Sequence, residues 1–344
     1  MDANTAFFLL VAGLFIASPL VYLAGRIDLR LLDGKIRAAR WLCAAVLILA
    51  WIPLFGAGVA VVQGDLVEIQ LGQMTLEMDG LGLFLAATVL MLVTLVGIYS
   101  IHYVGGEPDE EKYYAMLLAM TASMIGLGCA RDLFNLWVWF EAMAVTSFLL
   151  VIFYRSQPGA LEAGVKYILQ SAVGSMLVLF GIALVYAQAG TLDLVAMRPA
   201  LEDGGLLAVA AGGLFIIGFG VKAALVPLHT WLPDAHSQAP SGVSALLSGV
   251  VIECGLVAML RALHGITGLH AHVFPGRDDR AKPMAVASFR QALNVLGWSG
   301  RYSPHATRTT GSTRLNEMGY PADWIERQLA HVEPNAVRRT YNHA

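Results

Sequence analysis

Charged side chains and cysteines are scarce in this 344-residue chain. Only 14% of its residues are charged, whereas 57% are hydrophobic. Soluble globular proteins average about 25% charged and about 45–50% apolar residues, so this composition indicates a lipid environment. The three cysteines, Cys43, Cys129 and Cys254, are odd in number and set in apolar segments. This pattern excludes a disulfide framework and a CxxC metal site, and we interpret the cysteines as small packing residues.

The composition changes near residue 263. Residues 1–263 hold 12 basic and 19 acidic side chains, a net charge of −7, whereas residues 264–344 hold 10 and 6, a net charge of +4. The second part also holds six of the nine histidines. We therefore expect a membrane domain over 1–262 and a different, soluble fragment over 263–344. The chain has no glycine-rich nucleotide loop, flavin motif or cysteine cluster for iron–sulfur, so we expect it to carry no cofactor.

Long apolar runs dominate the first part. A membrane-spanning helix needs about 20 mostly apolar residues, and eight such runs predict an all-α multi-pass membrane protein. The runs are 5–24, 41–62, 80–103, 114–130, 133–154, 165–188, 205–227 and 240–262. The first run follows Asp2 without a basic leader, which indicates a retained span rather than a cleaved signal peptide. Short alternating stretches on either side of Gly72 predict a small interfacial β-hairpin.

Loop charges predict the orientation. The loops on one side carry eight basic residues, and those on the other side carry three. The first set is Arg26, Arg30, Lys35, Arg37, Arg40, Lys112, Arg155 and Lys166, and the second is Arg131, Arg198 and Arg261. The positive-inside rule puts the first set in the cytoplasm. We therefore predict a bacterial-type cell-membrane protein with its N-terminus outside, and eight spans also leave the C-terminal part outside.

The seventh run is interrupted by three prolines, Pro227, Pro233 and Pro240. Each proline removes a backbone donor and breaks a helix. Broken backbone at membrane depth is tolerated only inside protein or along a water-filled cavity. The stretch therefore predicts a polar cavity between helices.

Three ionisable residues lie inside the predicted spans: Glu141, Lys222 and Glu253. A charge at the centre of a membrane helix costs about 2.5–3.5 kcal/mol on insertion scales, so three of them are too expensive to be incidental. One interpretation is a structural salt bridge between Glu141 and Lys222. The other is a proton or ion relay, since buried Glu and Lys can titrate near neutrality.

Other titratable residues lie near the break. His229 and His236 flank Asp234 and add groups that titrate near neutral pH, which favours a relay over two structural histidines. Lys166, at the start of the sixth run, fits either an interfacial anchor or a part in proton transfer. We interpret Lys112, Arg155 and the acidic cluster 107–111 as solvated loop charges.

At these residues the chain resembles the antiporter-like membrane subunits of respiratory complex I (NADH-quinone oxidoreductase) and their relatives in multisubunit cation/proton antiporters and membrane-bound hydrogenases. The resemblance extends over residues 1 to about 262, and the run from Val221 is the most specific. The matching stretches are Met78–Leu85, Tyr99–Val104, Asp132–Glu141, Lys166–Ser175 and Val221–Val250.

The resemblance implies a function for these residues. In the family, the Glu and Lys that match Glu141 and Lys222 form an ion pair that controls a proton path, and His229 and His236 match histidines beyond the helix break. The position of Glu253 usually holds a lysine, so its charge here is reversed. The family fold has about fourteen helices in two inverted five-helix repeats, and this chain stops after the first repeat. The implied partners are other membrane subunits, which would hold any redox centre, and the transported ion is H⁺ or Na⁺.

The C-terminal part, over roughly 264–344, is similar to the end of phage-integrase-type tyrosine recombinases. His305, Arg308, His331 and Tyr341 match that family's catalytic residues. Arginine would stabilise charge on a scissile phosphate, and tyrosine would form the covalent link to DNA. The family's first arginine, its lysine and its DNA-clasping domain have no counterpart upstream. We therefore interpret this part as a remnant without DNA binding.

Three readings of the whole chain remain. It is a proton-translocating membrane subunit, a membrane-anchored DNA strand-transfer enzyme, or a non-functional fusion made when an integrating element truncated a transporter gene. Within the first reading, a Na⁺/H⁺ antiporter or a membrane hydrogenase subunit is the alternative to an NADH-quinone oxidoreductase subunit. The intact spans favour the first reading for the membrane part, and the missing second repeat favours the third for the chain's biology.

Overall fold

The computed structural model describes residues 2–72, 74–202, 204–276 and 279–298, together with Thr313, Glu317 and Gly319. The chain divides into two units, Met1–Val273 and Phe274–Ala344. The second unit contributes α13 (Val286–Leu293) and the π-helical turn η2 (Asn294–Trp298). The first unit contains the predicted membrane spans.

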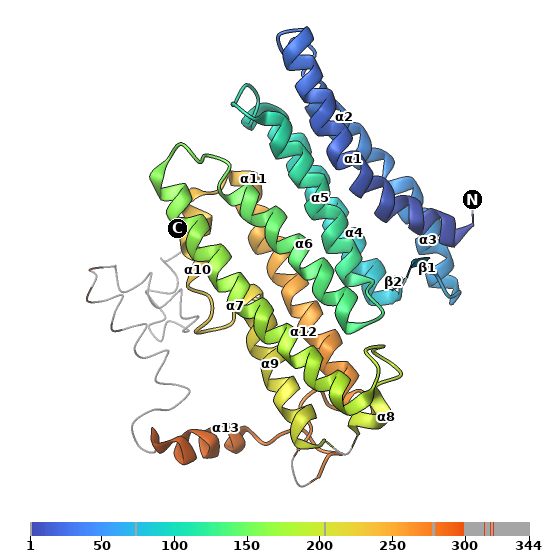
Figure 1. Ribbon diagram of the computed structural model, residues 1–344, viewed down its shortest axis with the longest axis vertical. Helices are drawn as coiled ribbons and strands as arrows, with labels where there is room; N and C mark the ends of the chain where they lie inside the picture. Colours follow the sequence, from blue (N-terminus) through green and yellow to red (C-terminus); the bar gives the residue numbers. More distant parts are fainter. Residues whose placement is uncertain are drawn as a thin grey trace, which may run out of the picture. The chain divides into compact units, whose positions relative to one another are not determined.

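The first unit is a bundle of long helices joined by short segments, as the sequence predicts (Figure 1). Its long helices are α1 (Ala3–Leu31), α2 (Ala38–Leu49), α3 (Trp51–Gln63), α4 (Gly80–Tyr103), α5 (Glu110–Gly128), α6 (Leu133–Val151), α7 (Pro158–Ala189), α9 (Leu206–Lys222) and α12 (Ile252–Thr267). Its short elements are α8 (Arg198–Leu201), α10 (Trp231–Gln238), α11 (Ser241–Leu246) and the π-helix η1 (Leu247–Val251).

Six helical segments of the described residues are long and apolar enough to cross a membrane. They are α1, α2 with α3, α4, α6, α7, and α11 through α12. Of the other two predicted runs, α9 is a shorter apolar helix, and α5 carries Glu110, Glu111 and Lys112 in its first turn. All eight runs therefore form helices, although α7 begins earlier than predicted, at Pro158, because proline fits the first turn of a helix.

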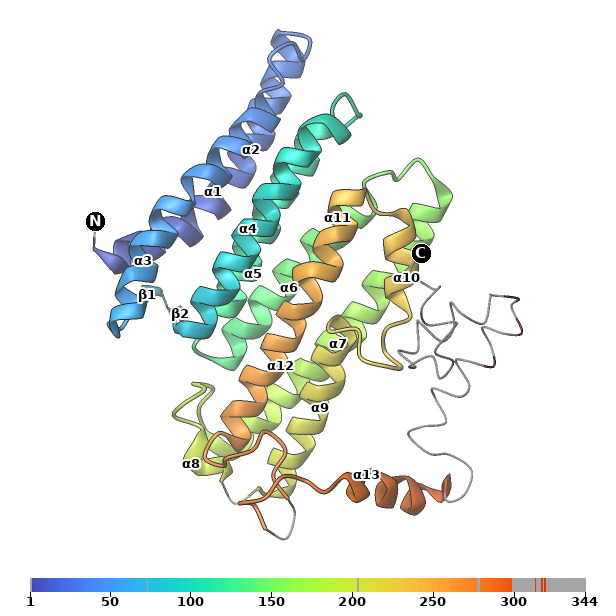
Figure 2. The ribbon, with the colours of Figure 1, turned by 180° about the vertical axis from the view of Figure 1, so that it is seen from behind.

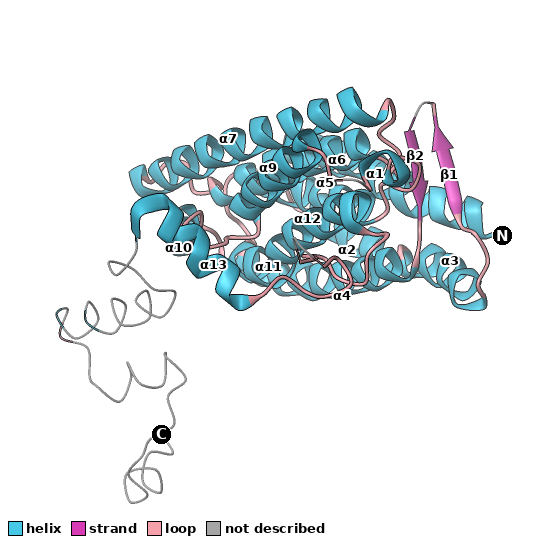
Figure 3. Ribbon diagram, turned by 90° about the horizontal axis from the view of Figure 1, so that it is seen from below, coloured by secondary structure: helices cyan, strands magenta, loops and turns pink. Residues whose placement is uncertain are grey.

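The predicted hairpin is confirmed. Strand β1 (Glu68–Leu71) pairs antiparallel with β2 (Met74–Glu77), so that Glu68 lies opposite Glu77. The turn passes through Gly72, whose φ of +65° is a conformation that glycine adopts without strain. Figure 3 shows the two strands at one end of the bundle, where β1 contacts α1.

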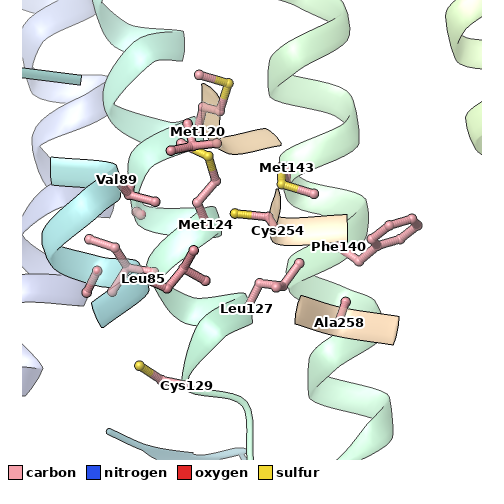
Figure 4. Packing of buried hydrophobic residues seen from close by; sticks show 14 of the residues in the cluster. Leu85, Val89, Met120, Met124, Leu127, Cys129, Phe140, Met143, Cys254 and Ala258 are labelled. Carbon is pink, nitrogen blue, oxygen red and sulfur yellow. The ribbon is translucent and has the colours of Figure 1, made fainter. Parts of the chain in front are cut away.

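Helix α5 is the centre of the bundle and packs against α1, α2, α4, α6 and α12. Nearly all of its residues are buried. Figure 4 shows Met120 and Met124 of α5 among Val89 of α4, Met143 of α6 and Cys254 of α12. The three cysteines are buried and free, which confirms their interpretation as packing residues. A helix buried on all sides can carry polar groups that lipid would exclude.

Helices α7 and α9 approach each other closely because glycines face each other between them. A Cβ atom at Gly218 would lie 2.6 Å from the carbonyl oxygen of Gly174, and one at Gly174 would lie 2.8 Å from the carbonyl oxygen of Gly218. Such close backbone contact is typical of membrane helices, whose association depends on packing rather than on the hydrophobic effect. Figure 2 shows α7 and α9 side by side, with α12 next to α9.

The predicted helix break is confirmed, but it begins earlier than expected. Helix α9 ends at Lys222 rather than near 227, and residues 223–230 form an irregular segment before α10. Ala224 has a φ of +51°, which an α-helix cannot contain. Pro233 does not interrupt a helix, contrary to our expectation. It is the third residue of α10, where no intrahelical hydrogen bond needs its N–H.

Candidate functional site

Lys222 lies at the helix break and is completely buried. Two contacts hold the break in place. The indole N–H of Trp231 donates to the carbonyl oxygen of Val221 at 2.8 Å, and the same oxygen accepts from the amide of Ala224 at 3.2 Å. Gly255 of α12 packs on the other side, where a Cβ atom would lie 2.7 Å from the amide nitrogen of Ala223. The lysine is therefore positioned by α9, α10 and α12 together.

The ammonium group of Lys222 is held by hydroxyls and an aromatic face. It donates to the hydroxyl of Tyr167 and, at 3.3 Å, to that of Ser147. The two hydroxyls also bond each other at 2.6 Å. The Nζ atom lies 4.4 Å from the centre of the Tyr167 ring and 6.0 Å from that of Trp231. A hydroxyl can accept from the charged amine and donate to the neutral one, so these partners can hold both forms.

Ser147, Tyr167 and Trp231 are functional candidates that the sequence analysis missed. All three are completely buried, and they come from α6, α7 and α10. Ser147 and Tyr167 carry no charge, so hydropathy does not single them out. The sequence shows only that Tyr167 follows Lys166 and that Trp231 follows the helix break. The fold is needed to show that these side chains and Ser147 meet at Lys222.

Glu141 lies on α6 and forms no ion pair with any residue that the structure describes. Its Oε1 atom is buried without a hydrogen-bond partner. The rings of Phe140 on α6 and Phe219 on α9, 5.1 Å apart, join the two helices beside it. The predicted structural salt bridge between Glu141 and Lys222 is therefore absent from the described residues.

The two predicted histidines have different surroundings. His229 lies in the irregular segment after α9, and its Nδ1 atom is buried without a hydrogen-bond partner. The Nδ1 atom of His236, on α10, lies 2.5 Å from the hydroxyl of Ser244 on α11. Orphaned buried polar atoms are uncommon in folded proteins. His229 and Glu141 therefore each have a buried polar atom without a hydrogen-bond partner, whereas Lys222 and His236 are hydrogen-bonded.

Lys166 and Glu253 form none of the contacts that hold Lys222. Lys166 is half exposed and bonds Asp234 and Glu162, each at 2.8 Å, so it joins α7 to α10. Glu253 is exposed on α12 directly after the π-helix η1, although it lies within a segment apolar enough to span a membrane. The structure thus gathers Lys222 with Ser147, Tyr167 and Trp231, and it leaves Glu253 on the outer face of the bundle.

The predicted solvation of the acidic cluster 107–111 is wrong for two of its members. Glu110 is buried at the start of α5 and accepts bonds from Arg40 at 2.6 and 2.9 Å and from Arg37 at 3.0 Å. Glu111 is also buried and lies 3.4 Å from Arg26. The first loop's arginines therefore fold onto α5 and cover these carboxylates, a long-range pairing that sequence position does not reveal.

The opposite end of the bundle has its own charged cluster. Arg131 bonds Asp193 at 3.0 Å and also bonds Glu77 of the hairpin. Arg261 bonds Asp79 at 2.6 Å. Lys112 and Arg155, by contrast, bond Asp109 at the end where α5 begins. The basic residues that loop charge assigns to opposite sides therefore do lie at different ends. The recombinase-like residues His305, Arg308, His331 and Tyr341 lie outside the described residues.

The helix break and Lys222 lie within a region that matches a known protein family. Residues 130–273 match the protein family described as "NADH:quinone oxidoreductase/Mrp antiporter, TM". The membrane part of this chain is antiporter-like. Residues 252–344 match the phage integrase family, so the C-terminal part is integrase-like. The two matches overlap over residues 252–273, within α12 and the segment that follows it.

The sequence relatives bear the names of subunits or components of different enzymes. The chain is 34% identical over 206 residues to F(420)H(2) dehydrogenase subunit N of Methanosarcina mazei, which covers 59% of this chain and 42% of that protein. It is 35% identical over 208 residues to hydrogenase-4 component B of Escherichia coli (60% and 30%). It is 31% identical over 223 residues to NADH-quinone oxidoreductase subunit N 2 of Symbiobacterium thermophilum (61% and 43%).

The fold is also similar to a solved structure. A chain of the membrane-bound sulfane sulfur reductase, an archaeal respiratory membrane complex, superimposes with a TM-score of 0.69 at 27% identity, over 76% of this antiporter-like chain and 53% of that one. The antiporter-like chain spans less than half the length of the three sequence relatives.

Proposed function

We propose that this chain is a proton-translocating membrane subunit of an NADH-quinone oxidoreductase-like complex, with Glu141, Lys222, His229 and His236 as its relay. The observation that carries the proposal is the surroundings of Lys222: a completely buried amine at a helix break, held by hydroxyls rather than by a carboxylate. A salt bridge would hold the proton on the lysine, whereas neutral partners leave it free to be given up and regained.

Glu141 is the proton donor or acceptor for Lys222 in this proposal. Since the two side chains form no ion pair, the proton passes through intervening groups. The linked hydroxyls of Ser147 and Tyr167 offer one such connection to the lysine. His229, with a buried ring nitrogen that has no partner, is a further acceptor beyond the break. His236 lies on α10 and Lys166 bonds Asp234 of the same helix, so both would serve the approach to His229 in this proposal.

The position of Glu253 bears on the onward path. An exposed carboxylate on a membrane helix is stable only when another protein surface or water covers it. The proposed partners are therefore other membrane subunits that pack on this face of α12. The relatives extend well beyond the matched region, and the proposal assigns the onward half of the path to the part of those proteins that the match does not reach.

The test is proton flux through proteoliposomes that contain the full-length chain. A potassium gradient with valinomycin supplies the driving force, and an internal pH dye reports the flux. The Glu141→Gln variant should lose the flux, while Glu162→Gln, a carboxylate of α7 bonded to Lys166 at the surface, should keep most of it. Flux that is undiminished in Glu141→Gln would refute the relay. Uptake of ²²Na⁺ in place of proton flux would identify a sodium path instead.

The integrase match favours a second candidate, a non-functional fusion of a truncated transporter and a recombinase remnant. This reading predicts no flux for the whole chain and no DNA cleavage. Recombinase activity would show itself as a covalent complex between the full-length chain and a nicked attachment-site DNA, lost in Tyr341→Phe. Its detection would overturn the interpretation of the C-terminal part as a remnant.

A further inference from the structure

A slot of about 440 Å³ lies between α1, α5 and α6, at the end of the bundle where α5 begins. Its walls are largely apolar and include Pro19, Met116, Leu149 and Phe153. None of the residues proposed for the relay lines it. It therefore needs an explanation separate from proton transfer.

The walls of the slot are held in place by the fold. The hydroxyl of Ser18 on α1 donates to the carbonyl oxygen of Ala115 on α5 at 2.8 Å, and both residues line the slot. Helices α1 and α6 are candidate membrane spans. An apolar slot that opens on the surface of a membrane bundle is filled by lipid rather than by water, because its walls offer water few hydrogen bonds.

The rim of the slot carries a net positive charge. The ammonium group of Lys112 lies 2.6 Å from Asp109, and the guanidinium group of Arg155 bonds the other oxygen of the same carboxylate. Two cations thus share one anion. Lys112 is 39% exposed and Arg155 is 60% exposed, and each has more N–H donors than a single carboxylate can occupy. The free donors are available to a second anion.

We propose that this slot binds one anionic phospholipid, with an acyl chain between α1, α5 and α6 and its phosphate between Lys112 and Arg155. The apolar walls match an acyl chain, and the rim matches a phosphate, which accepts charge-assisted bonds from Lys and Arg. Basic sites at the ends of membrane helices attract anionic headgroups in this way. A zwitterionic lipid brings its own cation and gains less from the rim.

Asp109 gives the proposal a test of opposite sign. It competes with the phosphate for both cations, so its removal should strengthen lipid binding, whereas removal of either cation should weaken it. Asp109 has a φ of +66°, and asparagine is among the residues that tolerate this conformation best. Asp109→Asn therefore removes the charge without disturbing the backbone.

The experiment is native mass spectrometry of the full-length chain in detergent, titrated with phosphatidylglycerol and with phosphatidylcholine of the same acyl chains. Phosphatidylglycerol should bind more tightly. Lys112→Gln and Arg155→Gln should each weaken its binding about fivefold, and Asp109→Asn should strengthen it about fivefold, since one basic side chain near a charged surface contributes about that factor. Lys35→Gln, which removes an exposed charge outside the slot, is the matched control and should change nothing.

A second pair of variants tests the apolar part. Met116→Trp should fill the slot and abolish binding, whereas Val145→Trp, at an exposed position of α6 outside the slot, should not. Equal affinity for the two lipids, weaker binding in Asp109→Asn, displacement of the lipid by millimolar inorganic phosphate, or a dimer of the chain in place of the lipid adduct would each overturn the proposal. The melting temperature of each variant identifies those that fail to fold.

Discussion

The bundle holds two groups of buried charge that are built in opposite ways. At the end where α5 begins, Glu110 accepts three bonds from Arg37 and Arg40. At the helix break, Lys222 has hydroxyl and aromatic partners, and Glu141 leaves an oxygen without a partner. The first group satisfies its charges and ties α2 to α5. The second gives its charges no counter-ion, which suits a site that must change protonation.

The two groups should therefore respond differently to the loss of a charge. Removing one partner of a fully paired buried group leaves the other charges without a counter-ion and destabilises the protein. Removing a buried charge that has no counter-ion should cost little stability, because its desolvation was already unfavourable. Proton flux should respond in the opposite way: it should be lost when a charge at the helix break is removed.

The largest effect on stability is expected for Glu110→Gln. The substitution leaves Arg37 and Arg40 without their shared carboxylate and should destabilise the bundle by about 3–5 kcal/mol. The melting temperature in detergent, compared with that of Glu107→Gln, a solvent-exposed carboxylate in the preceding loop, measures the difference. Equal melting temperatures for the two variants would mean that the arginine cluster is not a structural tie.

A smaller effect is expected at the contact between α7 and α9. Gly218→Ala places a Cβ atom against the carbonyl oxygen of Gly174 and should cost about 1–3 kcal/mol through overpacking. Since α9 carries Lys222, proton flux should also fall. Gly213→Ala, on the same helix with open space around it, should leave both stability and flux intact. An unchanged proton flux in Gly218→Ala would show that the relay does not depend on close packing of α7 against α9.

The smallest effect concerns pH and the loop charges at the end where α5 begins. The ammonium group of Lys112 holds the pKa of the Asp109 carboxyl below its usual range, and Arg155 acts in the same direction. A lowered folded-state pKa contributes stability above the unfolded-state value of about 3.8, and this contribution is lost as the pH falls through the folded-state pKa. The drop in melting temperature from pH 5 to pH 3 should therefore be slightly smaller in Asp109→Asn, and an equal drop would contradict the pairing.

Much of the fold could be predicted from the sequence because lipid imposes simple rules. The length of the apolar runs predicts the helices, and the basic residues of the loops predict which loops share an end of the bundle. The prolines predict the break before α10. The end of α9 at Lys222 was harder, because the apolar run continues to Pro227 while the break depends on Trp231 and Gly255 packing against it.

The site could be predicted only in part. Glu141, Lys222 and His229 are conspicuous because a charge or a titratable ring in an apolar run is costly. The hydroxyls of Ser147 and Tyr167 are not, since their role depends on α6 and α7 meeting at one lysine. Glu110 is missed for the same reason. In the sequence it belongs to a charged loop, and its burial depends on Arg40 of a distant segment packing against it.

The most direct measurement of the central claim is proton flux and melting temperature together for Lys222→Met in full-length chain reconstituted in proteoliposomes. Methionine has a similar length, and Ser147 and Tyr167 would still bond each other. A melting temperature at or above that of the unchanged chain, with proton flux lost, is the result expected for a relay lysine that has no counter-ion. A folded variant with undiminished flux, or a collapse in stability like that expected for Glu110→Gln, would contradict it.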